Sequence, residues 1–117
     1  MNYDTWKIHD FSTGITSGDD YKKFQRNMRS DLRKQAADNH MVIQEFSGSH
    51  YEFSAILKSE TTGKLVFVSI SDVRFFKNQW FNHVLFRRMK DEKDYSGGNN
   101  HFCSWPEIGR KAAQLAS

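Results

Sequence analysis

The sequence predicts an α+β fold, in which an antiparallel sheet of about four strands packs against a long N-terminal helix and a short C-terminal helix. Three observations indicate this fold. A charged segment with helical periodicity comes first, a stretch of alternating and β-branched residues follows, and a short segment that opens with serine and proline ends the chain. The expected order is therefore helix, three or four strands, helix.

The long helix is predicted to begin at Ser17-Gly18-Asp19-Asp20 and to run to about Asn39. Serine with an acid three positions later resembles a capping box, and two acids in the first turn suit the positive end of the helix dipole. Residues 1–18 are interpreted as an N-terminal arm that packs its aromatic side chains on the core, with a recognition arm as the alternative. The apolar stripe of the helix is formed by Tyr21, Phe24, Met28 and Leu32, continued by Gln35 and Ala36.

The middle of the chain predicts the sheet. Met41 to Phe46 is the first strand, and residues 50–76 fold as a hairpin about the polar turn Glu60-Thr61-Thr62-Gly63, where glycine adopts a positive φ without steric cost. Lys64 to Ile70 is almost continuously apolar and β-branched, so it is predicted to be a central strand buried on both faces. Trp80 to Met89 alternates and is predicted to be the last strand, with a helix as the alternative.

The end of the chain predicts a loop and a second helix. Lys90 to Asn100 is polar throughout and is expected to be a loop. Ser104-Trp105-Pro106-Glu107 reads as a capping box with proline in the first turn, where its missing N–H is not needed. The packing face of the short helix is predicted to consist of Ile108, Ala112 and Leu115.

Composition limits the classes of function. The 117 residues are expected to form one domain over 1–117, and they contain no apolar run of the ~18 residues that a membrane span needs. The N-terminus lacks the features of a signal peptide, and a single cysteine is typical of a reducing compartment. We therefore expect a cytoplasmic protein without a membrane partner. A net charge of +3 permits nucleic-acid binding and opposes an acidic DNA mimic.

The first candidate site is a line of basic side chains along the predicted helix. At helical spacing, one narrow line contains Lys22, Arg26, Arg29 and Arg33. Asp31 is the only acid in the middle of this helix, and arginine pairs with phosphate bidentately, so the line is suited to tracking phosphates. The alternative is a solvated face whose arginine stems cover apolar edges.

The second candidate site is the loop that follows the predicted last strand. Glycines that expose backbone N–H groups beside a helix start can form an anion site, and arginines from the strand end could complete it. The alternative is a loop of turn residues that binds no ligand. The residues assigned to this site are Arg87, Arg88, Tyr95, Gly97, Gly98 and Asn99.

No catalytic residue, metal site or cofactor is predicted. His101 and Cys103 lack the paired spacing of a structural zinc site, and a cysteine beside aromatic residues is more typical of a small buried side chain than of a nucleophile. Thr62-Gly63-Lys64 lacks the upstream glycine and the following hydroxyl residue of a phosphate-binding loop, and no helix follows it. We therefore expect a protein that is not an enzyme.

The charged helix, the strand meander and the segment Lys93-Asp94-Tyr95-Ser96-Gly97-Gly98-Asn99 together resemble small accessory proteins of phages and mobile elements in Gram-positive bacteria. Anti-CRISPR proteins are one such group. The resemblance is one of overall character, and no functional residue carries over from it. It implies a non-enzymatic inhibitor or adaptor in the cytoplasm of a bacterial host. Such a protein would use a basic surface on a protein or nucleoprotein partner, in its concrete form a CRISPR effector nuclease. A direct nucleic-acid-binding, regulatory protein is the alternative, and a small enzyme is the third hypothesis.

Overall fold

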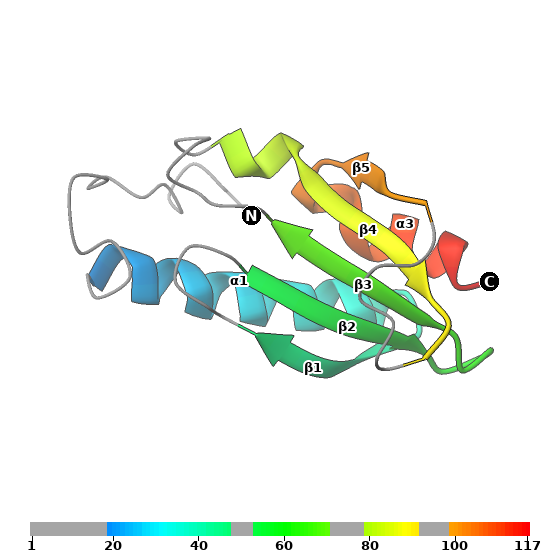
Figure 1. Ribbon diagram of the computed structural model, residues 1–117. Coiled ribbons are helices and arrows are strands. Elements are labelled where there is room, and N and C mark those ends of the chain that lie inside the picture. The colour runs from blue at the N-terminus through cyan, green and yellow to red at the C-terminus, as the bar shows by residue number, and fades with distance from the viewer. Residues whose placement is uncertain (1–18, 48–52, 71–78, 92–98) are drawn as a thin grey trace.

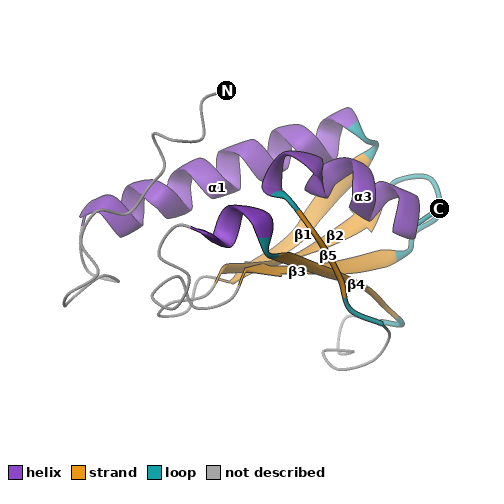
Figure 2. Cartoon of the chain, turned by 90° about the horizontal axis from the view of Figure 1, so that it is seen from above, coloured by secondary structure: helices purple, strands orange, loops and turns teal. Residues whose placement is uncertain are grey.

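The computed structural model describes residues 19–47, 53–70, 79–91 and 99–117 (Figure 1). Within these ranges, a five-stranded antiparallel sheet in the order β1-β2-β3-β4-β5 carries the helices α1 and α3 on one face (Figure 2). The predicted α+β fold is confirmed, with one strand more than the expected four. The elements are α1 (Asp19–Asp38), β1 (Met41–Ser47), β2 (Phe53–Ser59), β3 (Leu65–Ile70), the 3-10 turn η2 (Gln79–Asn82), β4 (Val84–Met89), β5 (His101–Cys103), the 3-10 turn η3 (Trp105–Glu107) and α3 (Ile108–Leu115).

The main core lies between the sheet and the two helices. Phe24, Met28, Leu32 and Ala36 are buried along one side of α1, as their spacing predicted. On α3, Ile108 and Ala112 are buried and Leu115 packs at the edge of the same core. The strands contribute alternate residues to this core, because successive side chains point to opposite faces of a sheet. These are Phe53, Ala55 and Leu57 from β2, Val66, Val68 and Ile70 from β3, and Val84 and Phe86 from β4.

The predicted hairpin is confirmed over the described residues 53–70, and so is the central strand. β3 is the third of the five strands, and the β2–β3 turn closes where the N–H of Gly63 donates to the carbonyl oxygen of Ser59 at 2.9 Å. Gly63 has a φ of +76°, the left-handed conformation that glycine adopts most readily. Burial on the outer face of β3 is less complete than predicted, since Leu65 is buried there while Phe67 and Ser69 are half-buried.

One boundary and one strand differ from prediction. The last predicted strand, Trp80 to Met89, is a strand only from Val84 onward. Gln79–Asn82 forms a 3-10 turn instead. β5 was not predicted, and its three residues are too few to show an alternating pattern.

The prediction of a capping box at Ser104 is wrong, because the expected side-chain hydrogen bond does not form. Ser104 is the N-cap of η3 and Pro106 lies in its first turn, but the serine hydroxyl makes no capping bond. A 3-10 turn precedes α3, so the backbone N–H of Glu107 donates to the carbonyl oxygen of Ser104 at 3.1 Å instead. The predicted N-terminal arm and the Ser17 cap of α1 lie outside the described residues.

A polar network joins α1 to the C-terminal segment. Asp31 is 5% exposed, and its Oδ2 accepts hydrogen bonds from Trp105 Nε1 at 2.8 Å and from Gln35 Nε2 at 2.9 Å. The backbone N–H of Gly109 donates to Gln35 Oε1 at 2.9 Å. A Cβ at position 109 would lie 2.7 Å from the Cβ of Gln35, so only glycine allows this approach. The network fixes which side of α1 faces the rest of the molecule.

Candidate nucleic-acid interface

The predicted basic line lies on the surface of α1. Lys22, Arg26, Arg29 and Arg33 are all exposed, and we call these four residues the basic face. At a rise of about 1.5 Å per residue, eleven residues separate its ends by about 16 Å along the helix. Helical spacing puts the basic face on the flank of the buried stripe that is opposite to Asp31. The packing of α1 therefore directs the whole line toward β1 and solvent.

The aromatic ring of Phe46, at the end of β1, supports two of these arginines. The guanidinium carbon of Arg29 lies 4.6 Å from the centroid of the ring, and that of Arg33 lies 5.4 Å from it. These are cation–π distances, and each such contact contributes about 0.5–1 kcal/mol at an exposed site. Phe46 in turn packs against Phe53, with ring centroids 5.7 Å apart. The ring holds both head groups in place while leaving them accessible.

An irregularity in β1 gives Phe46 this position. Ile43 pairs with Leu57 and Glu45 with Ile56, so one extra residue of β1 is accommodated between them. Such a bulge reverses the alternation of every later side chain in the strand. Phe46 consequently pairs with Ala55 on the helix-covered face, where regular pairing would have turned it to the other face. The bulge thus brings the ring beneath the arginines.

The basic face keeps its positive charge uncompensated by the described part of the chain. No described carboxylate forms an ion pair with Lys22, Arg26, Arg29 or Arg33. Asp31, the acid nearest in sequence, is directed into the network with Trp105. A small recess of about 150 Å³ beside the face is lined by Gln25, Arg29, Phe46, Ser47 and Phe53. The arrangement offers guanidinium donors in a row to an anionic partner.

The structure does not bring Arg87 and Arg88 together, as the second predicted site requires. Arg87 and Arg88 are neighbours in β4 and therefore point to opposite faces of the sheet. Arg87 is 3% exposed, and its guanidinium carbon lies 5.0 Å from the ring centroid of Phe67. Arg88 is exposed at the other face. These two arginines cannot both complete one anion site.

The loop part of that second site is mostly outside the described residues. This holds for Tyr95, Gly97 and Gly98, while Asn99 is described and exposed just before β5. The proposal that this loop binds an anion therefore stays a prediction. β5 lies between the loop and η3, so the glycines do not lead directly into a helix.

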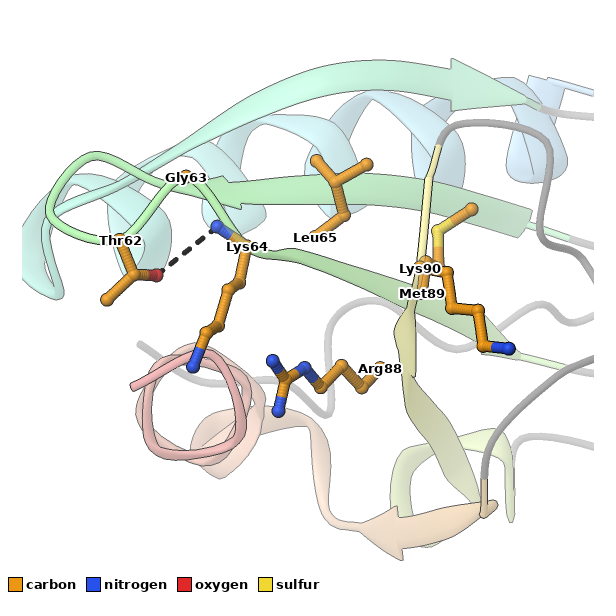
Figure 3. A pocket seen from close by; sticks show the side chains of 7 residues that line it. All are labelled: Thr62, Gly63, Lys64, Leu65, Arg88, Met89 and Lys90. Carbon is orange, nitrogen blue, oxygen red and sulfur yellow. Dashed lines mark hydrogen bonds between the residues drawn. The ribbon is translucent and has the colours of Figure 1, made fainter.

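Sequence reasoning missed a cationic pocket at the β2–β3 turn. The pocket has a volume of about 430 Å³, and three basic residues line it together with the turn (Figure 3). They are Lys64, Arg88 and Lys90. Only the β3–β4 register, in which Leu65 pairs with Met89, brings Lys64 close to the end of β4. A single sequence contains no signal for that register.

Neither a metal site nor a reactive thiol stands out in the described residues. No three His, Cys, Asp or Glu side chains gather there as metal ligands would. Burial, with a smaller contribution from the charge of Glu107, raises the pKa of Cys103 to about 11. The thiol is therefore protonated at neutral pH and a poor nucleophile. Among the helices of the described ranges, none combines the length and the apolar character of a membrane span.

Comparison of the chain with protein-family models, with curated proteins and with solved structures gave no match. The resemblance to phage and mobile-element accessory proteins thus stays a prediction.

Proposed function

We propose that the protein is a non-enzymatic inhibitor or adaptor that docks through the basic face of α1 on the phosphate backbone of a nucleoprotein partner. The observation that carries the proposal is the pair of exposed guanidinium groups, Arg29 and Arg33, held on the ring of Phe46 without a described carboxylate. A CRISPR effector nuclease is one nucleoprotein of this kind, and an anti-CRISPR role is the most specific form of the proposal.

The arginines and the length of the basic face suit a run of phosphate groups. A guanidinium group presents a planar set of donors that matches two phosphate oxygens at once. Because Phe46 already restricts both side chains, binding costs them less conformational entropy than it would cost a free side chain. The length of the basic face, about 16 Å, allows contacts with several successive phosphates of one strand.

Two exposed apolar side chains favour a partner that contains protein as well as nucleic acid. Val42 on β1 is 44% exposed and Phe102 on β5 is 63% exposed, whereas most large apolar side chains of the described core are buried. Four cations alone support only weak, non-specific binding to bare nucleic acid, with a dissociation constant on the order of 10⁻⁴–10⁻⁶ M. Apolar contacts with a protein would supply the remaining affinity and the specificity.

Direct nucleic-acid binding is the second candidate, because the basic face by itself accounts for it. Fluorescence anisotropy with labelled single-stranded DNA, duplex DNA and RNA at about 50 mM and 200 mM salt tests it. The wild type is compared with Arg26→Gln/Arg29→Gln/Arg33→Gln. A control variant with the same loss of charge is Lys58→Gln/Arg110→Gln/Lys111→Gln, whose residues lie on β2 and α3.

We expect salt-sensitive binding that the arginine variant loses and the control variant keeps. Contacts with three or four phosphates would give a slope of about −3 in a plot of log affinity against log salt concentration for duplex DNA. Equal losses in both variants would contradict the basic face as the contact surface. A pull-down of a purified CRISPR effector complex, with and without nuclease treatment, then separates the two candidates, since an inhibitor that contacts protein remains bound after treatment.

A further inference from the structure

The cationic pocket lies at the other end of the sheet from Phe46. β1 and β2 pair from Met41 with Ser59 at the turn end to Ser47 with Ser54 at the far end, and Phe46 lies next to that far end. We propose that this pocket binds a phosphate group of a small phosphorylated molecule. The inference is independent of the proposed function, because the pocket shares no residue with the basic face.

Hydrogen bonds fix the position of Lys64 in the pocket wall. Its backbone N–H donates to Thr62 Oγ1 at 3.2 Å (Figure 3), and the Thr62 hydroxyl donates to the carbonyl oxygen of Ala116 at 2.6 Å. The ammonium group of Lys64 donates one hydrogen bond to the carbonyl oxygen of Ser117 at 3.0 Å. An ammonium group has three N–H donors, so two remain for a ligand.

Arg88 supplies the second donor group. It pairs with Val66 across β3 and β4, and its side chain is exposed. Its guanidinium group and the ammonium group of Lys64 point toward the same side of the pocket, while that of Lys90 points the other way (Figure 3). Lys64 and Arg88 are thus the expected ligand contacts, and Lys90 adds to the positive potential.

The charge and size of the pocket indicate a phosphorylated ligand. The seven described residues that line it include three cations and no carboxylate, which gives the pocket a positive potential. The Lys64 ammonium already donates to the backbone oxygen of Ser117, just beyond α3, whereas the Arg88 side chain forms no hydrogen bond or ion pair with the described residues. A volume of about 430 Å³ exceeds that of a bare phosphate and lies in the usual range of small-molecule sites.

Isothermal titration calorimetry with inorganic pyrophosphate tests the proposal, with acetate as the monovalent control. The proteins are the wild type, Arg88→Gln, Lys64→Gln, Arg26→Gln from the basic face and, as a matched control, Arg110→Gln, an exposed residue of α3 that belongs to neither site. Arg88→Gln is the decisive variant, because this exposed side chain contributes little packing and the fold should persist. Circular dichroism melting of each variant verifies the fold.

We expect pyrophosphate to bind the wild type and Arg110→Gln equally, and to bind Arg88→Gln and Lys64→Gln about ten-fold more weakly or worse. An oligonucleotide should show the opposite dependence, with weaker binding to Arg26→Gln and unchanged binding to Arg88→Gln. The absence of pyrophosphate binding to the wild type would overturn the proposal, as would binding that neither pocket variant changes. If Arg88→Gln weakened the binding of the oligonucleotide instead, the pocket would be part of the nucleic-acid-binding surface and the small-molecule proposal would fail.

Discussion

The two polar flanks of α1 differ in their environment, since one is covered by the rest of the molecule and the other is exposed. On the flank that faces η3 and α3, Asp31 and Gln35 are covered and bonded to Trp105 and Gly109. On the flank that faces β1, Arg29 and Arg33 are exposed. Their described contacts are with the face of one aromatic ring, that of Phe46. Both flanks are polar in the sequence. The first holds the fold together, whereas the second keeps its donors available for a partner.

The largest effect on stability is expected from the covered flank. Asp31→Ala removes the acceptor of Trp105 Nε1 and one acceptor of Gln35 Nε2, which leaves a buried indole N–H without its partner. We expect the free energy of unfolding to fall by about 1–3 kcal/mol. Urea denaturation measures this loss. Asp38→Ala, at an exposed position of the same helix, is the control and should change stability by less than about 0.5 kcal/mol.

An intermediate effect is expected from Phe46 on the other flank. Phe46→Leu keeps an apolar side chain against Phe53 but removes the ring on which Arg29 and Arg33 lie. The free energy of unfolding should fall by less than about 1.5 kcal/mol, while oligonucleotide affinity falls about two- to five-fold as the arginines lose their fixed positions. Anisotropy measures the affinity. Unchanged affinity would mean that the ring does not position the guanidinium groups for binding.

The smallest effect, none at neutral pH, is expected from the Cys103 thiol. Burial raises its pKa from 9.0 to about 11, so the folded protein keeps the proton at a pH where the unfolded chain has lost it. The folded state then binds more protons, and stability falls as the pH rises from about 9 to about 11. Denaturation at pH 7, 9 and 11, with Cys103→Ala as the control, measures this dependence. A wild type and a variant with parallel pH profiles would contradict it.

The sequence predicted those parts of the fold that depend on local pattern. The stripe from Phe24 to Ala36 and the apolar run before Ile70 have a clear period or composition, and both form the elements expected. β5 was missed because three residues carry no period. The candidate site was predicted in part, since the basic face follows from helical spacing alone.

The missing parts of the site depend on register, which a single sequence does not determine. Phe46 meets Arg29 only because of the bulge in β1, and strict alternation would have directed its ring to the other face. Lys64 and Arg88 are far apart in the chain and meet through the pairing of β3 with β4. Similarly, Arg87 and Arg88 were assigned to one site because they are neighbours in the sequence. In β4 their side chains point to opposite faces of the sheet.

The bulge in β1 also limits how this edge of the sheet can pair with a strand of another molecule. β1 is an edge strand of the described sheet, and a long regular edge invites pairing with a strand of another molecule. The extra residue between Ile43 and Glu45 interrupts the even spacing of its outward N–H and carbonyl groups. An incoming strand can match only part of such an edge. The irregularity that directs Phe46 toward the arginines therefore also discourages growth of the sheet from one molecule into the next.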